Sequence, residues 1–268
     1  MKAMAAIAVN VFRESVRDKV LYNLVLFAIL LMGASYLLGQ LTAGQDVKVI
    51  KDLGLSATSV FGLFIAVFIG IGLVSKEVER RSVYSLLPKP IHRYQLVVGK
   101  YAGLTLTLVV NIAIMTLAFY AVLFYTAWGV DPTVQKAWDA PALDPALLKA
   151  IALILIELLV VTAIALFFST FSTPILSAGF TFGLFVAGHF STDLRNFDQV
   201  VDSPAAVQLA RGLYWILPNL GQFDVKAQVV HGQQVPIGYM AMTALYAALY
   251  IAMLLTIAVY VFSRRDFK

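Results

Sequence analysis

The chain has 268 residues, of which 60% are hydrophobic and 13% charged, and its formal net charge is +5. The mean hydropathy of +0.85 and an apolar content above the roughly 45–50% usual for soluble domains exclude a soluble protein. The absence of cysteine excludes disulfide bonds, thiolate metal sites and cysteine nucleophiles.

The first 19 residues have an amphipathic pattern. Apolar residues recur at helical spacing and polar residues fill the opposite face. The apolar set is Met4, Ile7, Ala8, Val11, Phe12 and Val16, and the polar set is Asn10, Arg13, Glu14, Arg17 and Asp18. Residues 1–19 are predicted to form an amphipathic helix at the cytoplasmic surface, and the pattern does not fit a signal peptide.

Apolar runs long enough to cross a hydrocarbon core of about 30 Å follow along the chain. They cover residues 20–39, 55–74, 100–126, 147–168, 174–190 and 237–262. The fifth run is short, and part of the third should project beyond the bilayer. The prediction is an all-α integral membrane protein with six transmembrane helices, in which residues 1–268 form one domain.

Residues 75–100 concentrate charge between the second and third runs. The charged side chains are Lys76, Glu77, Glu79, Arg80, Arg81, Lys89, Arg93 and Lys100. A short helix is expected from Ser75 to Leu87, which Pro88 and Pro90 end, and a second helix should start near Ile91 and run into the third span. Residues 75–99 are therefore predicted to form a cytoplasmic helical hairpin. Either its charges only set the membrane topology, or the hairpin also acts as a lever on which a partner exerts force.

Glu157 lies at the centre of the fourth run. A charge at mid-bilayer costs about 2.5–3.5 kcal/mol on insertion scales, so Glu157 should face protein or a wet cavity. Either it meets the substrate in a cavity, or it is protonated or hydrogen-bonded to a neighbouring helix, with Asn111 as one candidate partner. The sequence leaves both interpretations open.

Gly179 and Gly183 in the fifth run have the small-xxx-small spacing that lets two helices approach closely. The close contact is either with a second copy of the chain or within one copy. The outer segment 191–236 is too long for a structureless loop. Ser203 as N-cap and Pro204 at the first helical position predict an outer interfacial helix before the last span, anchored by Tyr214 and Trp215.

Lysine and arginine are distributed unevenly between the two sides of the membrane. The N-terminal segment, residues 75–100 and the C-terminus hold thirteen of the 20, and cationic loops stay on the cytoplasmic side. Both termini are therefore predicted to be cytoplasmic. This excess explains the net charge without a nucleic-acid partner.

Several enzyme classes are disfavoured by missing motifs. There is no phosphate-binding loop, because the Gly99-Lys100 pair lacks the upstream glycine and a following hydroxyl residue. His92, His189 and His231 lie far apart without an adjacent glutamate, so no metal site and no catalytic residue is predicted. An ion-gradient-driven carrier, which would need several intramembrane ionisable groups, stays as the alternative to a transport subunit powered by a separate ATPase.

The segment "EVERRSVYSLLPKPIHRYQLVVGKYAG" resembles the one that follows the second span in ABC-2 (type-two ABC exporter) permeases. That pattern reads Glu-Arg-Gly-Thr, several apolar residues, Pro, Arg and then Gly-Lys. The matching residues are Glu79, Arg80, Pro90, Arg93, Gly99 and Lys100. Arg81 and Ser82 replace Gly-Thr, as in a branch named for multicopper enzyme maturation, and the order of elements agrees over essentially the whole chain.

The resemblance implies the permease subunit of an ATP-driven exporter in the inner membrane of a prokaryote. It implies three partners: an ABC ATPase subunit, a second permease copy that forms a homodimer with this chain, and membrane lipid. ATP and Mg would bind the ATPase, and no cofactor would bind this chain. The coupling helix would contact the ATPase through Glu77, Glu79, Arg80, Arg81, Ser82 and Tyr84, while Pro90, Arg93 and Lys100 join the hairpin to the third span. The substrate class stays open.

Overall fold

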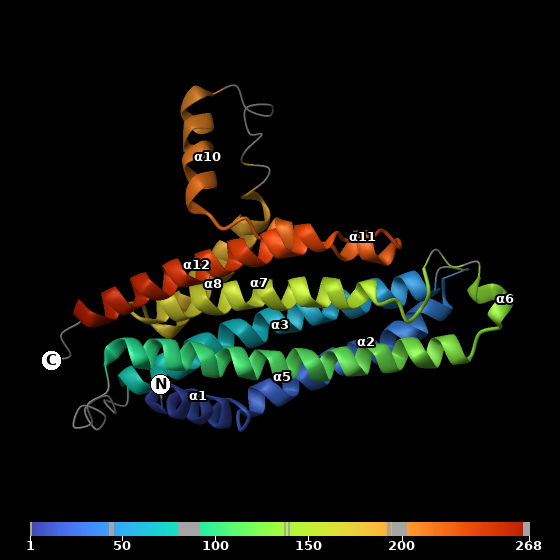
Figure 1. The fold of residues 1–268 in the computed structure, drawn as a ribbon, viewed down its shortest axis with the longest axis horizontal. Helices are drawn as coiled ribbons and strands as arrows, with labels where there is room; N and C mark the ends of the chain where they lie inside the picture. Colours follow the sequence, from blue (N-terminus) through green and yellow to red (C-terminus); the bar gives the residue numbers. More distant parts are fainter. Residues whose placement is uncertain are drawn as a thin grey trace.

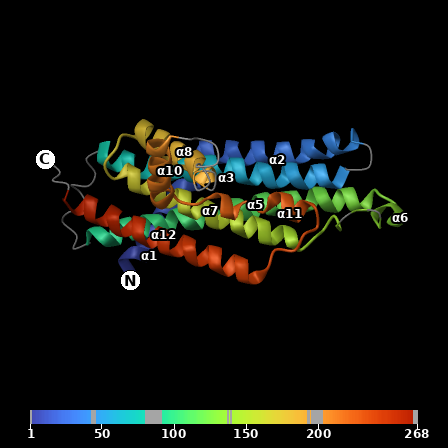
Figure 2. The same ribbon diagram turned by 90° about the horizontal axis from the view of Figure 1, so that it is seen from above.

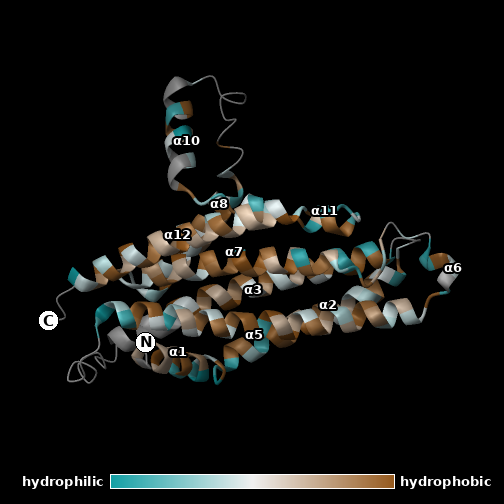
Figure 3. Cartoon of the chain, in the orientation of Figure 1, coloured by the Kyte–Doolittle hydropathy of each residue, from teal (hydrophilic) through white to brown (hydrophobic). Residues whose placement is uncertain are grey.

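The computed structural model describes residues 2–42, 46–79, 92–136, 138, 140–191, 194 and 203–264. Their regular structure is helical throughout, and the long helices run side by side along one axis (Figure 1). Hydrophobic residues cover most of the bundle, and hydrophilic residues gather toward its two ends (Figure 3). The prediction of an all-α membrane protein is confirmed.

Among the described residues, 5 helices are long and apolar enough to cross a membrane. They are α2 (Lys19–Gln40), α3 (Asp46–Glu79), α5 (Arg93–Trp128), α7 (Ala146–Ser169) and α12 (Ile237–Arg264). The fifth predicted span is α8 (Pro174–His189), which has 16 residues. At 1.5 Å per residue α8 is about 24 Å long, so it is shorter than a hydrocarbon core of about 30 Å.

The helix α3 extends beyond the apolar run 55–74 at both ends. Its first two turns contain the charged residues Asp46, Lys48, Lys51 and Asp52. A search for apolar runs therefore misses these turns. An acidic residue in the first turn is nevertheless favourable at a helix N-terminus. At the other end α3 continues without a break to Glu79. The first arm of the predicted hairpin is thus, as far as Glu79, a direct continuation of the second span.

The helix α7 lies at the centre of the bundle. It is apolar on all sides, which is typical of a fully buried helix, and it packs against α3, α5, α8 and α12. Its buried side chains join those of α3 and α5 in the main hydrophobic core. The polar residues Glu157, Thr162 and Ser169 of α7 are therefore held inside the protein.

The N-terminal helix α1 (Lys2–Ser15) packs against the first turns of α5. A Cβ atom at Gly103 would lie 2.6 Å from the carbonyl oxygen of Ala8 and 2.7 Å from Val11, so only glycine permits this approach. Val11 then joins residues of α5, α7 and α12 in a second hydrophobic cluster. The glycine spacing that brings helices together within this chain is therefore Gly99 to Gly103, one turn apart on α5.

The start of α1 and the end of α12 lie at the same end of the bundle, where α3 ends and α5 begins (Figure 1). The opposite end carries α6 (Pro132–Gln135) and α11 (Lys226–Val230). Two lysines fasten the connections there: Lys51, 1% exposed, donates to the carbonyl of Pro141 at 2.8 Å, and Lys149 donates to the carbonyl of Val235 at 2.9 Å.

The helix predicted in the outer segment 191–236 is α10 (Pro204–Ile216). It projects from the side of the bundle, roughly across the bundle axis, and is seen nearly end-on in Figure 2. The chain returns to the bundle after α10 and continues through the short helix η2 (Gly221–Phe223) to α11. The interfacial placement of α10 stays a prediction.

Candidate functional site

Glu157 lies near the midpoint of α7 and is only 3% exposed. The nearest charged partner of its Oε1 is Nε2 of His189, the last residue of α8, at 3.3 Å. This distance permits an ion pair, but Oε1 makes no hydrogen bond of acceptable geometry. Glu157 therefore faces protein, as the cost of a charge in lipid requires.

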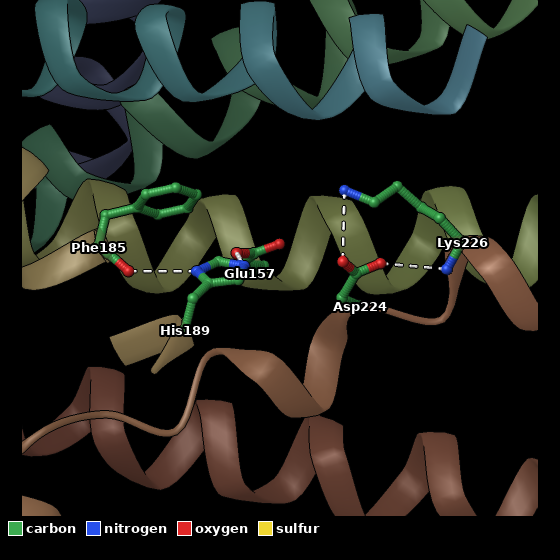
Figure 4. A network of polar contacts seen from close by, with 5 residues as sticks. All are labelled: Glu157, Phe185, His189, Asp224 and Lys226. Atoms are coloured by element: carbon green, nitrogen blue, oxygen red, sulfur yellow. Dashed lines mark hydrogen bonds and ion pairs between the residues drawn. The ribbon is translucent and has the colours of Figure 1, made fainter. Parts of the chain in front are cut away.

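The ring of His189 makes two contacts with Phe185 (Figure 4). Its Nδ1 lies 3.1 Å from the carbonyl oxygen of Phe185, one turn earlier on α8. The rings of Phe185 and His189 also pack together, with centroids 4.5 Å apart. With the ring in this position, Nε2 of His189 lies 3.3 Å from Oε1 of Glu157.

A second charged pair lies beside α7 in the segment that leads into α11 (Figure 4). The Lys226 ammonium is 3.6 Å from Oδ2 of Asp224, and the backbone N–H of Lys226 donates to Oδ1 of Asp224 at 3.2 Å. The pair lies farther along α7 than Glu157 and His189 (Figure 4), and its Asp224 side chain is 40% exposed.

Asn111 is not brought to Glu157 as a hydrogen-bond partner. Its side-chain amide donates to the carbonyl of Thr107 on the same helix at 2.7 Å, and the residue is 3% exposed. The partner that the sequence reasoning missed is His189, which was treated only as one of three scattered histidines. Its position at the end of a predicted span was the signal, because an ionisable residue inside a membrane usually pairs with another.

The fifth span ends at this pair. α8 ends at His189, and the later segment 217–220 lies against this end, where the N–H of Leu220 donates to the carbonyl of Gly188 at 3.0 Å. The N–H of Asn219 donates to the hydroxyl of Tyr246 at 2.9 Å. Irregular backbone at membrane depth is tolerated only where it is buried in protein or lines a cavity, and these hydrogen bonds satisfy that requirement.

The predicted coupling residues lie partly outside the described part of the chain. Glu77 and Glu79 belong to the last turn of α3. Arg80, Arg81, Ser82, Tyr84 and Pro90 lie outside the described residues. Their role stays a prediction.

The second arm of the hairpin begins at Arg93, where α5 starts as one continuous helix into the third span. The Arg93 guanidinium donates to the carbonyl of Phe262 at 3.2 Å and to that of Ser263. A cation at the C-terminal end of α12 also suits the helix dipole. Lys100 is 4% exposed, so it belongs to the interior of the bundle.

Gly179 and Gly183 are exposed, and a Cβ atom at either would meet nothing within 4 Å. Among the described residues nothing packs on this glycine face, so the arrangement within one copy of the chain, one of the two expected, is not seen there. Large apolar residues on the same helix are exposed as well, including Ile175 at 85% and Phe180 at 49%. The face is available to lipid or to another chain.

Comparison with protein families gives one match that covers nearly the whole chain. The model of the ABC-2 family transporter proteins matches residues 5–267. No curated protein matches the sequence at a significant level.

Proposed function

The chain belongs to the ABC-2 family of transporter proteins, and from this membership we propose that it couples ATP hydrolysis by a separate ATPase subunit to export. The family makes the chain a transmembrane permease of an ABC transporter. The ATPase would carry ATP and Mg, because this sequence contains no phosphate-binding loop. The inner membrane of a prokaryote, with both termini in the cytoplasm, is the proposed location.

The observation that carries this proposal is the continuity of two membrane helices into the charged connection. α3 runs unbroken to Glu79, and α5 starts at Arg93. α3 also packs against the central helix α7, and Arg93 ties the start of α5 to the end of α12. A force applied between residues 79 and 93 would therefore be transmitted to α3 and α5, and through them to α7 and α12.

The test is co-purification with a candidate ABC ATPase subunit, followed by assay of hydrolysis in lipid vesicles. We expect a stable complex whose ATP hydrolysis rises when candidate lipids, peptides, drugs or sulfur compounds are added. In a matched control variant, residues 80–91 are replaced by a Gly/Ser linker of equal length. This variant should insert into the membrane but should not stimulate ATP hydrolysis by the ATPase. Substrate movement driven by an ion gradient without ATP would contradict the proposal and favour the carrier.

Dimerisation through α8 is a further part of the proposal. The exposed face of Gly179 and Gly183 has the small residues that allow close helix contact. Cysteines introduced at these two positions should crosslink between copies in membranes. Leu249→Cys on α12, a position 64% exposed, is the control and should not crosslink. Failure of both α8 cysteines to join two copies would reject this interface.

A further inference from the structure

The protonation of His189 follows in part from its contacts. Nδ1 lies 3.1 Å from the carbonyl oxygen of Phe185. A carbonyl oxygen only accepts hydrogen bonds, so Nδ1 must carry a proton for this contact to be favourable. The second ring nitrogen, Nε2, lies 3.3 Å from Oε1 of Glu157. Its protonation therefore depends on Glu157.

The pair is favourable only when one proton lies between these two atoms. Without it, the lone pair of Nε2 would face a negative carboxylate oxygen that is buried and has no hydrogen-bond donor. With one proton, either the carboxylic acid donates to the neutral ring or the imidazolium donates to the carboxylate. Both forms leave the pair without net charge, which a buried site in a membrane requires.

The neighbouring elements supply little other charge that titrates near neutral pH. The other ionisable groups there are Asp224 and Lys226 before and in α11, Tyr101 on α5, and Tyr246 and Tyr250 on α12. Asp224 and Lys226 compensate each other, and tyrosines stay neutral up to a pH of about 10. Residues 53–71 of α3 contain no ionisable side chain, and α8 contains only His189.

We propose that Glu157 and His189 form a proton-binding site in the middle of the membrane bundle. The proton joins the end of α8 to the central helix α7. The His189 side chain is 27% exposed whereas Glu157 is 3% exposed, so the ring is the side from which the proton is exchanged. Release of the proton loosens the contact between α8 and α7 and makes the arrangement of the fifth span depend on protonation.

The test compares the purified full chain with Glu157→Gln in detergent, between about pH 5 and pH 9. Above about pH 6.5 the histidine of the unfolded chain has lost its proton. The folded chain still holds one proton on the Glu157–His189 pair, so the folded state binds one proton more than the unfolded state. The free energy of unfolding therefore falls as pH rises. We expect the midpoint of thermal unfolding to fall by roughly 2–8 °C over this range. In Glu157→Gln the amide donates to Nε2 without titrating, so the midpoint should change much less.

The matched control is His231→Gln. His231 makes the same contact to a carbonyl one turn earlier, with Nδ1 2.8 Å from the oxygen of Ala227, but it lies at the end of the bundle. This variant should keep the wild-type pH profile. A Glu157→Gln profile that falls as steeply as wild type would overturn the proposal. So would a wild-type profile without pH dependence.

A second measurement does not require Glu157→Gln to fold. Nitrogen NMR of the wild-type chain labelled at histidine should show His189 with a proton on Nδ1 and with Nε2 in a hydrogen bond, assigned by comparison with His231→Gln and His92→Gln. A His189 ring protonated on Nε2 alone would overturn the proposal. Both measurements use the permease without an ATPase, so their failure is separate from a failure of the transport function.

Discussion

Replacement of His189 by leucine is expected to destabilise the folded chain by about 3–5 kcal/mol at alkaline pH, where it leaves an ionised, buried carboxylate without its partner. Glu157 lies on the central helix and is 3% exposed, so water does not replace the lost contact. At acid pH the carboxyl becomes neutral, and the cost should fall to that of an unsatisfied polar group, about 1–3 kcal/mol. Unfolding in detergent at the two pH values measures the difference.

The control for this prediction is the double variant Glu157→Leu with His189→Leu. Removal of both partners leaves no buried charge, and apolar replacement of a buried ion pair is often neutral or stabilising. The double variant should therefore recover most of the stability lost in the single variant. A single variant as stable as wild type would show that the 3.3 Å contact contributes nothing to the fold.

Charge reversal in the connection between α3 and α5 should weaken association with the ATPase by about 30-fold or more. Glu79 ends α3, and Arg81 follows it two residues later. Truncation of one partner of a desolvated charge pair costs about 2–5 kcal/mol at an interface. Glu79→Lys and Arg81→Glu are therefore expected to insert with both termini on the same side as wild type but to bind the ATPase poorly. Binding measured by co-purification at several salt concentrations checks this.

Lys48→Glu is the matched control, because Lys48 lies near the start of α3 at the opposite end of the bundle. It reverses one charge without touching the proposed contact surface. Loss of a single cation from residues 75–100 leaves the excess on that side largely intact, so topology should not change in any of these variants. If both charge-reversal variants bind the ATPase and transport normally, the charges of this connection only set the membrane topology.

The positions of the membrane helices were largely predictable from the amino-acid sequence. The hydrocarbon core demands about 20 consecutive apolar residues, and each predicted run contains the centre of an observed helix, including the short α8. The ends were less predictable. Lys48, Lys51 and Asp52 lie inside the first turns of α3, because a helix continues past the membrane wherever protein or water satisfies its polar side chains.

The sequence by itself also determined that Glu157 must be shielded from lipid, since this follows from the cost of a charge in hydrocarbon. Its partner was decided only by the tertiary structure. His189 meets Glu157 because α8 has only 16 residues and ends at the level of the midpoint of α7. The predicted runs give the approximate lengths of these two helices, but local sequence does not determine which of their faces meet.

The same distinction applies to the glycines. The spacing of Gly179 and Gly183 and that of Gly99 and Gly103 are equivalent as patterns, and both permit close approach. Only the path of the chain places α1 against Gly103 and leaves Gly179 and Gly183 uncovered. Local sequence therefore determined which segments cross the membrane and where contact is sterically possible, whereas the packing of helices distant in the chain decided which contacts form, because those contacts depend on all the helices together.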